Sequence, residues 1–491
     1  MFSDIKRLSS QTIVYGAGNM LSRLIGFFLL PILTHHLTPE QYSVYTQFYI
    51  GITIGMTVIA LGLDISLLRY YVLEKDFWRR KRIFSTVFWV SLFATGALTI
   101  AIMFKAEDIA AVLLTIETAL PDWAPYTLRL CVVILALDIL ANYPTIVMRG
   151  ENQAGRFTFV NIASASAQFV LSVVFVVGLK RGIAGIFEAN LLSSVLRLTL
   201  CLPTIIERLR LKFDISVLRD CLAFGLPNVP NLLFVTLVET FSRWLLGYIK
   251  GEYENGLFSA AYRLGMFLSV VAMGFRYAWQ PFFLQIAHRS DAKEVYARVL
   301  TYYTAIALWL FLLLTAWVEP LAKWNIPFIG YLIAPEYWKG LGVFPIVLLA
   351  HIFNGIYAVF MVGVYLEKKT HILPAITGFA ATLNIAGNLL LIPRFGMWAA
   401  AWMTVASWAA MTILLYVYIQ RVYPVRYEWG RILKLCFWAG IVFTMSRIGQ
   451  SVQMDWLGWL FSAAFPLPLL SANFLTEGER KRLGTFLGLK L

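Results

Sequence analysis

Charged residues are scarce in this chain of 491 residues. Asp, Glu, Lys and Arg make up 14% of the sequence, whereas hydrophobic residues make up 59%. A soluble domain carries roughly 25% charged residues, and a water-soluble globule of this size cannot bury so much apolar surface. The composition therefore excludes an ordinary soluble protein and favours an integral membrane protein.

Cysteine and the common catalytic motifs are also scarce. The four cysteines lie in or beside apolar runs, without a CxxC motif or a Cys/His cluster: Cys131, Cys201, Cys221 and Cys436. We expect them to be small buried hydrophobic side chains that form neither disulfides nor a metal site. The sequence contains no DxD pair, no glycine-rich phosphate loop and no HExxH motif. We therefore expect a protein that is not an enzyme and holds no cofactor.

The apolar residues form fourteen runs that are long enough to cross a bilayer as helices. These runs are 12–34, 43–67, 83–104, 125–148, 157–179, 182–203, 216–247, 257–285, 296–318, 340–366, 371–392, 395–419, 431–448 and 454–474. The run 216–247 contains Pro227 and Pro230, so we expect it to be kinked or to begin as an interfacial segment. The N-terminal segment MFSDIKRLSSQ has no small-residue cleavage site, so we expect no removable signal peptide.

The net charge of +14 is divided unevenly between two sets of connections. The set that includes 79–82 and 479–482 holds about 27 of the 41 Lys and Arg residues, and the other set holds about 8. Lys and Arg are enriched in cytoplasmic loops, so we expect both termini to be cytoplasmic. The basic composition is then a signal of membrane orientation and does not require a nucleic-acid partner.

The chain contains a weak internal repeat. The segments GIAGIFEANLLSS (182–194) and GMWAAAWMTVASW (396–408) each open a run of small residues after a turn that contains arginine. Small residues allow helices to pack closely, and parallel repeats are common in transporters. We expect an all-α integral membrane protein with an N-terminal lobe (1–212) and a C-terminal lobe (213–426). Each lobe would have six transmembrane helices, and two further helices and a cytoplasmic tail would occupy 427–491.

Ionisable residues inside the apolar runs mark candidate functional positions, because such residues usually face a cavity or a partner. The cations are Arg23, Arg197, Arg243, Arg263 and Arg276, and the acids are Asp138, Glu188, Glu239 and Asp64. Surplus guanidinium groups suit an anionic substrate, and phosphate or pyrophosphate is bound bidentately by arginine. A carboxylate in a cavity of low dielectric constant is a candidate for coupling to H⁺ or Na⁺.

Several of these residues allow a second interpretation. Glu239 and Arg243 are four residues apart and could neutralise each other on one helix face. Arg69 and Arg129 are close enough to their helix ends to snorkel to the membrane surface. Arg23 is near the midplane and has no carboxylate within four residues. It either contacts the substrate or pairs with a deep acid such as Asp138.

Several segments resemble the polysaccharide transporter family, the O-antigen-type oligosaccharide flippases of the multidrug/oligosaccharidyl-lipid/polysaccharide exporter superfamily. LLPILTHHLTPEQYSVYTQFY (29–49) carries part of the resemblance, and the long segment 364–408 is the most specific. SRLIGF (22–27) is similar to the first helix of the lipid II flippase of this superfamily, in which an arginine is a functional cavity residue. One departure is Ser43, because the family usually has glycine after the tyrosine of its LxPxxYG turn.

The resemblance implies two V-shaped lobes that work by alternating access. The implied substrate is a polyprenyl-diphosphate-linked oligosaccharide, which is moved across a bacterial cytoplasmic (inner) membrane for surface polysaccharide biosynthesis. The expected partners are membrane lipids and a polysaccharide polymerase or other assembly proteins. A multidrug/ion antiporter of the same superfamily remains an alternative, although it would line its cavity with acids. A second alternative is a membrane subunit of a polysaccharide secretion complex.

Overall fold

The computed structural model describes residues 18, 20–113, 123–326, 330–451 and 454–466. In these residues the chain is almost entirely helical, with one short antiparallel pair of strands, β1 (Asn325–Ile326) and β2 (Gly330–Tyr331). Ten of the described helices are long and apolar enough to cross a membrane, and there are eleven if the bent pair α3 and α4 is counted as one span. The chain is therefore an all-α, multi-pass membrane protein, as its composition predicts.

A helical segment begins at Met20 and continues into the first labelled helix. The elements of the first half are α2 (Leu29–His36), α3 (Pro39–Ile59), α4 (Leu63–Leu73), α5 (Phe77–Phe104), α6 (Ala106–Leu113), α7 (Trp123–Gly150), α8 (Ala154–Val173), the π-helix η1 (Val174–Gly178) and α9 (Gly182–Arg208). The elements of the second half are α10 (Ile215–Gly225), η2 (Leu226–Asn228), α11 (Val229–Lys250), α12 (Glu252–Ile286), α13 (Ala292–Ala322), η3 (Pro335–Val343), α14 (Phe344–Leu366), η4 (Thr370–Ile372), α15 (Leu373–Val422), α16 (Trp429–Ser451) and α17 (Asp455–Ala464).

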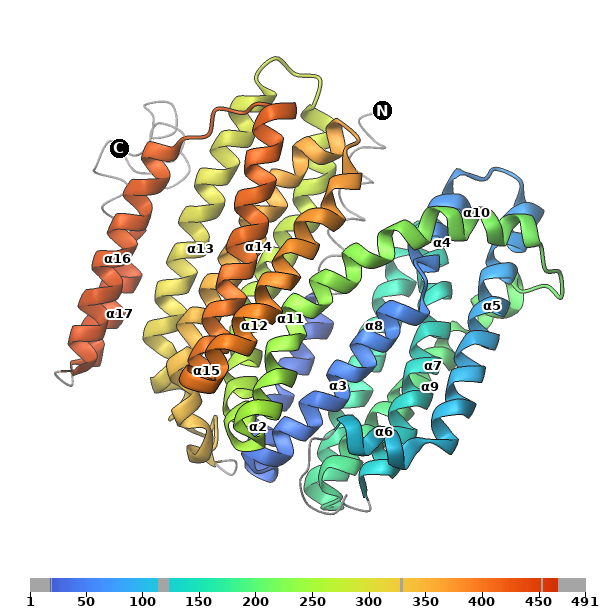
Figure 1. The fold of residues 1–491 in the computed structure, drawn as a ribbon, viewed down its shortest axis with the longest axis horizontal. Coiled ribbons are helices and arrows are strands. Elements are labelled where there is room, and N and C mark those ends of the chain that lie inside the picture. Colours follow the sequence, from blue (N-terminus) through green and yellow to red (C-terminus); the bar gives the residue numbers. More distant parts are fainter. Residues whose placement is uncertain (1–17, 19, 114–122, 327–329, 452–453, 467–491) are drawn as a thin grey trace.

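The helices form two groups that lie side by side, with α3 and α11 crossing between them (Figure 1). We call α3–α9 the N-terminal group and α11–α15 the C-terminal group. One buried hydrophobic cluster includes Leu67 and Phe187 of the N-terminal group, and a second includes Val238 and Trp408 of the C-terminal group. Helices α16 and α17 pack against α13, where the rings of Trp317 and Trp459 stack 4.8 Å apart.

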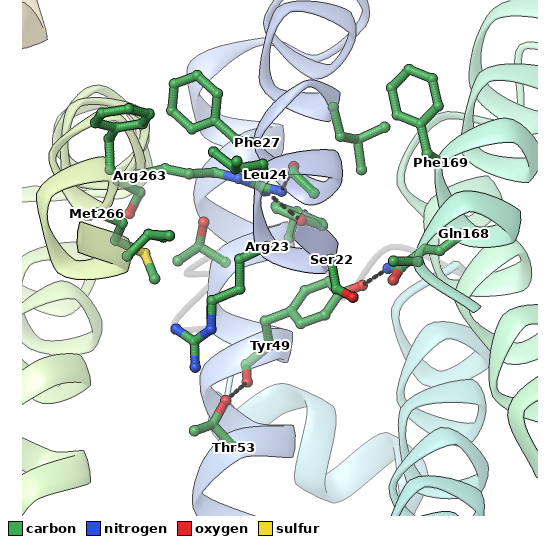
Figure 2. A pocket seen from close by; sticks show the side chains of 18 of the residues that line it. Ser22, Arg23, Leu24, Phe27, Tyr49, Thr53, Gln168, Phe169, Arg263 and Met266 are labelled. Carbon is green, nitrogen blue, oxygen red and sulfur yellow. Dashed lines mark hydrogen bonds between the residues drawn. The ribbon is translucent and has the colours of Figure 1, made fainter. Parts of the chain in front are cut away.

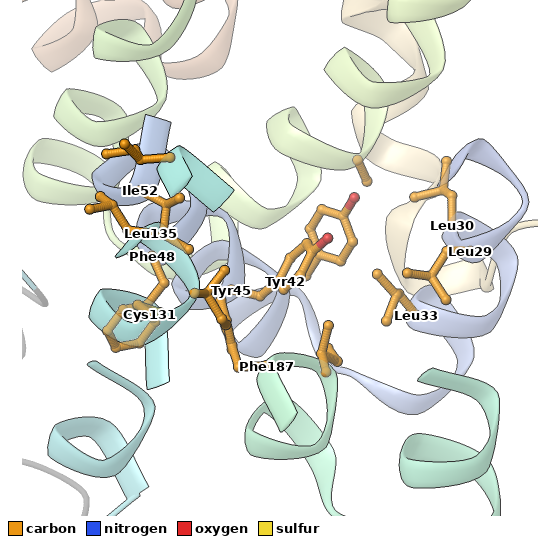
Figure 3. Packing of buried hydrophobic residues seen from close by; sticks show 14 of the residues in the cluster. Leu29, Leu30, Leu33, Tyr42, Tyr45, Phe48, Ile52, Cys131, Leu135 and Phe187 are labelled. Carbon is orange, nitrogen blue, oxygen red and sulfur yellow. The ribbon is translucent and has the colours of Figure 1, made fainter. Parts of the chain in front are cut away.

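The turn between α2 and α3 is formed by the LTPEQYS segment. Thr38 caps α3 by accepting a hydrogen bond from the Gln41 amide (3.4 Å), and the Gln41 side chain accepts one from the Thr38 amide (3.1 Å). Pro39 occupies the first helical position, where its fixed φ is favourable. Tyr42 and Tyr45 then point into a packed cluster with Leu33 of α2 and Phe187 of α9 (Figure 3). The turn therefore fixes how the first two helices meet the rest of the N-terminal group.

The second predicted span, 43–67, falls on a bent pair of helices. Helix α3 ends at Ile59, α4 begins at Leu63, and the two are bent by 48°. Gly62 between them has a φ of +68°, and a Cβ atom there would lie 2.4 Å from the carbonyl oxygen of Gly225. Only glycine suits this combination of a left-handed backbone and a close approach by another helix.

The predicted interruption of the run 216–247 at its prolines is confirmed. Helix α10 gives way at Leu226 to the 3-10 turn η2, which holds Pro227, and α11 follows from Val229. Pro230 falls in the first turn of α11, where a proline costs no helical hydrogen bond. Helix α10 lies against α4 and α5 of the N-terminal group, so this segment connects the two groups.

The 50 residues of α15 are two helices that fold back on each other at Gly396. This glycine has non-helical backbone angles (φ 53°, ψ −133°). The side-chain amide of Asn384 donates to the Ser407 hydroxyl at 3.1 Å, although a continuous helix would place these residues more than about 30 Å apart. Glu254 of α12 secures the break by accepting a hydrogen bond from the Met397 amide at 2.7 Å. The two predicted runs 371–392 and 395–419 correspond to the two halves.

Three of the four cysteines are buried, as expected, and none of the four forms a disulfide in the described residues. Cys436 is exposed, so the expectation of burial was wrong for it. It lies on α16, which packs mainly against α13 and α17 and leaves much of its surface facing outwards.

Candidate functional site

A cavity of ≈ 440 Å³ lies between the N-terminal and C-terminal groups. Its walls come from the helical segment that begins at Met20, from α3 and α8 on one side, and from α11 and α12 on the other. Figure 2 shows Arg23 in the middle, Gln168 and Phe169 on one wall, and Arg263 and Met266 on the opposite wall. Three of the five predicted cations, Arg23, Arg243 and Arg263, line this cavity, together with one predicted acid, Glu239.

Arg263 of α12 is held by hydrogen bonds from both of its terminal amines. One amine donates to the Tyr45 hydroxyl of α3 at 2.8 Å, and the other donates to the Gly26 carbonyl of the first helical segment at 2.8 Å. These partners are neutral, so the positive charge is not cancelled by a carboxylate. Arg263 therefore joins three elements around the cavity and contributes positive potential to it.

Arg243 and Glu239 lie one turn apart on α11, but their side chains form no ion pair in the described structure. The Arg243 guanidinium donates to the backbone carbonyl of Glu239 at 3.0 Å and lies 4.6 Å from the centre of the Tyr262 ring. This cation–π geometry stabilises a charge without neutralising it. The interpretation in which the two residues neutralise each other thus gains no support from the geometry.

Glu239 is surrounded electrostatically by arginines. Among the charged groups, Arg243 has the strongest electrostatic interaction with its carboxylate, followed by Arg276 and Arg23. It forms no hydrogen bond or ion pair with any residue that the structure describes. A cavity with three cations and one acid in its lining has an excess of positive charge.

Arg23 is exposed to the cavity and is the least constrained of the three cations. Its side chain extends from the first helical segment into the open space (Figure 2). It forms no hydrogen bond or ion pair within the described part of the chain. Its guanidinium is thus available to an anion that enters the cavity.

The N-terminal wall of the cavity is polar but neutral. The Tyr49 hydroxyl accepts hydrogen bonds from the side-chain amides of Gln168 (3.1 Å) and Asn190 (2.7 Å), and Thr53 lies one turn further along α3. Tyr49 and Gln168 are not among the residues predicted from the sequence, because those predictions rest on charged side chains. A glutamine within the apolar run 157–179 was the signal that could have identified this wall.

The remaining predicted cations lie outside the lining of this cavity. Arg197 of α9 faces Asp138 of α7 at 3.7 Å, and the Asp138 carboxylate also accepts a hydrogen bond from Ser194. Asp138 therefore has Arg197 as its partner, and the pairing of Asp138 with Arg23 is not formed. Arg276 of α12 donates to the Asn354 side chain of α14 at 2.6 Å.

The remaining predicted acids also lie away from the cavity. Glu188 pairs with Arg181 at 2.8 Å and accepts a hydrogen bond from the Tyr126 hydroxyl at 2.9 Å. Asp64 has one buried carboxylate oxygen without a hydrogen-bond partner among the described residues, and Arg149 is the cation that acts on it. Across the described residues, no group of three or more His, Cys, Asp or Glu side chains is placed to hold a metal ion.

A polar contact joins the two groups where α3 crosses α12. Glu252 accepts hydrogen bonds from Ser43 and from the Gln47 side-chain amide (2.9 and 3.0 Å), and Asn255 donates to the Ser43 hydroxyl at 2.5 Å. Ser43 is the residue that departs from the family's usual glycine, and its hydroxyl is part of this contact. Next to it, a Cβ atom at Gly256 would lie 1.8 Å from the Pro39 carbonyl oxygen. The backbones of α3 and α12 therefore touch at this point.

Comparison with solved structures identifies the fold. The lipid II flippase MurJ in an inward closed conformation matches with a TM-score of 0.69 and 14% identity, over 92% of this chain and 98% of that one. An inward-facing multidrug resistance MATE family transporter of the MOP superfamily matches with a TM-score of 0.68 and 15% identity, over 86% and 98% of the two chains. A MOP superfamily transporter from Pyrococcus furiosus matches with a TM-score of 0.61 and 16% identity, over 88% and 96%.

Comparison of sequences identifies the family. No curated protein matches the chain. The family described as polysaccharide biosynthesis protein matches residues 8–287, which is more than half of the chain and includes every residue that lines the cavity. The chain therefore belongs to the polysaccharide biosynthesis protein family and has the fold of the MOP superfamily transporters.

Proposed function

We propose that this protein is a flippase that moves a polyprenyl-diphosphate-linked oligosaccharide across the cytoplasmic membrane for surface polysaccharide biosynthesis, such as that of O-antigen. The observation that carries the proposal is the cavity between the two helix groups, whose lining holds Arg23, Arg243 and Arg263 against the single acid Glu239. A diphosphate carries several negative charges, and arginine binds it through paired hydrogen bonds.

The two walls of the cavity suit the two parts of such a substrate. The diphosphate would bind Arg23, which has no hydrogen-bond or ion-pair partner among the described residues, with Arg243 and Arg263 adding positive potential from the C-terminal side. The sugars would contact the neutral wall around Tyr49, Thr53 and Gln168. The hydroxyl and amide groups there can both donate hydrogen bonds to a glycan and accept them from it. The lipid tail would remain in the bilayer, because burying a long hydrocarbon chain in a polar cavity is unfavourable.

We further propose a topology of fourteen membrane crossings with both termini in the cytoplasm, in lobes 1–212 and 213–426 followed by 427–491. The fold-back of α15 at Gly396 supports this count, because it turns one long helical run into two crossings. The concentration of Lys and Arg on one set of connections supports the orientation.

Alternating access requires the two lobes to separate at one end of the cavity and then at the other. The contact of Ser43 and Gln47 with Glu252 would close the outer end in the inward-facing state. The similarity to an inward-facing and an inward closed structure supports the proposal that this structure represents an inward state. Release of the oligosaccharide outside would require these hydrogen bonds to break.

We propose Glu239 as the residue that couples transport to H⁺ or Na⁺. It is the acid in the cavity lining, it lies among arginines, and its carboxylate has no direct partner in the described structure. Asp138 and Glu188 are weaker candidates because arginines already pair with them. Asp64 remains a candidate, because one of its carboxylate oxygens is buried without a partner.

The direct test is reconstitution of the purified protein in vesicles that contain a labelled polyprenyl-diphosphate-linked oligosaccharide. We expect the protein to make the labelled sugar accessible from the other leaflet, and we expect Arg23→Ala to abolish this. Arg129→Ala is the matched control, because Arg129 is an exposed arginine that does not line the cavity. Absence of flipping by the wild-type protein, or full activity of Arg23→Ala, would contradict the proposal.

A multidrug antiporter is the second candidate, because several matched structures are MATE transporters and Glu239 gives the cavity one acid. The Pyrococcus furiosus relative is described as having a binding pocket of reverse polarity that suggests a different function. Pocket charge can therefore differ on this fold. Efflux of a cationic dye by the reconstituted protein, lost in Glu239→Gln, would favour the antiporter.

A further inference from the structure

A second pocket lies at the edge of the N-terminal group and shares no lining residue with the cavity. It has a volume of ≈ 260 Å³ and is lined by Trp78 and Arg82 at the start of α5 and by Arg210 and Lys212 between α9 and α10. Three of its four lining residues are cations. In Figure 1 this part of the molecule lies at the side of α5 that faces away from the C-terminal group.

The backbone between α9 and α10 is held in place by α5. The Trp89 indole donates to the Arg210 carbonyl at 2.9 Å, and the Arg210 amide donates to the Ser85 hydroxyl at 2.8 Å. The Asp214 amide donates to the Thr86 hydroxyl at 3.2 Å. These bonds fix the segment so that Arg210 and Lys212 share one pocket with Arg82.

The positive charge of the pocket is only partly neutralised. One amine of Arg82 pairs with Asp214 at 3.4 Å, and one amine of Arg210 donates to the Leu209 carbonyl at 2.7 Å. The other carboxylate oxygen of Asp214 accepts hydrogen bonds from the Ser216 amide and hydroxyl at the start of α10. Lys212 has no partner among the residues that the structure describes. The pocket can therefore accept an anion.

The surroundings of the pocket are apolar and exposed. Trp78 is 63% exposed, Leu211 92% and Ile215 70%. Large apolar side chains beside a cationic pocket at the end of a membrane helix are placed to contact acyl chains while the cations contact a headgroup.

We propose that this pocket binds the phosphodiester headgroup of an anionic phospholipid of the cytoplasmic leaflet. The exposed apolar rim favours a lipid over free phosphate. The position outside the cavity favours a resident membrane lipid over the transported substrate. The segment between α9 and α10, which carries Arg210 and Lys212, leads into the connection between the two helix groups. A bound lipid would therefore hold this segment against α5.

The test uses native mass spectrometry and thermal melting of the full-length protein with phosphatidylglycerol, phosphatidylcholine or inorganic phosphate. We expect the wild type to prefer phosphatidylglycerol over phosphatidylcholine by at least about tenfold and to be stabilised by it. The triple variant Arg82→Gln/Arg210→Gln/Lys212→Gln should lose this preference. A control that removes three charges elsewhere, Lys368→Gln/Lys369→Gln/Arg421→Gln, should keep it.

Lys212→Gln serves as a second variant, because the Lys212 side chain has no hydrogen bond or ion pair with any described residue that the substitution would remove. We expect it to reduce the preference about fivefold. Equal preference in the wild type and the triple variant would overturn the proposal. Competition by inorganic phosphate at the same concentration as the lipid would also overturn it, because the pocket would then be a site for soluble anions.

Discussion

Two regions of the molecule place arginine inside the membrane-spanning part and treat its charge differently. Between α7 and α9, Arg197 faces the carboxylate of Asp138 at 3.7 Å, and Ser194 adds a hydrogen bond to the same carboxylate. In the cavity, Arg263 has only neutral hydrogen-bond partners, Arg243 lies against an aromatic ring, and Arg23 has no partner in the described structure.

The difference is between arginines whose charge a carboxylate offsets and arginines whose charge has no carboxylate partner among the described residues. An arginine paired with a carboxylate inside one helix group adds little net charge and has little to offer a substrate. Arginines in a cavity between two groups keep their charge and can bind an anion there. We therefore propose that the excess of cations in the cavity serves substrate binding and that the Asp138–Arg197 pair mainly stabilises the fold.

The largest effect is expected for Arg263→Ala. The change removes two charge-assisted hydrogen bonds of 2.8 Å that join α12 to α3 and to the first helical segment. We expect complete loss of transport and a loss of about 3 kcal/mol in the free energy of unfolding, measured by flipping in vesicles and by denaturant titration. Arg263→Lys should recover part of the transport, because lysine keeps the charge but cannot make both bonds. Wild-type stability of Arg263→Ala would show that these bonds do not hold the cavity together.

Breaking the ion pair in the N-terminal group should lower stability and leave transport by the folded protein unchanged. Asp138→Asn leaves Arg197 without its carboxylate, and because each side chain is about one-fifth exposed we expect a loss of about 2 kcal/mol. The double variant Asp138→Asn/Arg197→Gln should recover most of the lost free energy of unfolding. If the double variant folded normally but failed to transport, the pair would belong with the functional charges.

Removing the acid of the cavity should increase its affinity for anions. Glu239→Gln eliminates the negative charge among Arg243, Arg276 and Arg23, so we expect a diphosphate to bind several-fold more tightly. Transport should also lose its dependence on an H⁺ or Na⁺ gradient. Unchanged affinity together with unchanged gradient dependence would remove Glu239 from the mechanism.

The smallest effect is expected where α3 meets α12. Ser43→Gly removes the hydroxyl that donates to Glu252 and accepts from Asn255, and Gln47 remains as a donor to the carboxylate. We expect the contact to weaken by about 1 kcal/mol, which would raise the fraction of molecules whose cavity is open to the outside. Labelling of a cysteine introduced at Thr53 by an impermeant reagent would measure this, with Ser43→Thr as the control.

The membrane class and most helix positions could be predicted from the sequence, because both depend on local hydrophobicity and on proline. The interruption at Pro227 was predictable for the same reason. The bend at Gly62 was not, because it depends on the approach of Gly225, which is distant in the sequence. The exposure of Cys436 likewise depends on how few helices pack around α16.

The sequence allowed us to predict that the candidate site is cationic, but not which residues form it. The sequence indicated which arginines lie deep in the membrane, and three of the five do line the cavity. It could not indicate that Asp138 lies beside Arg197, or that Ser43 contacts Glu252 from 209 residues away, because such partners are set by tertiary packing. Tyr49 and Gln168 were not predicted because only charged residues were taken as candidates, although a glutamine in the apolar run 157–179 was a usable signal.

The central claim, that the cavity arginines bind a diphosphate, is tested most directly by comparing two ligands. Equilibrium binding of a polyprenyl diphosphate and of the matching polyprenyl monophosphate would be measured for the wild type, Arg23→Ala and the control Arg129→Ala. We predict that the wild type and the control bind the diphosphate at least about tenfold more tightly than the monophosphate, and that Arg23→Ala loses most of this preference. The same preference in all three proteins would contradict the claim.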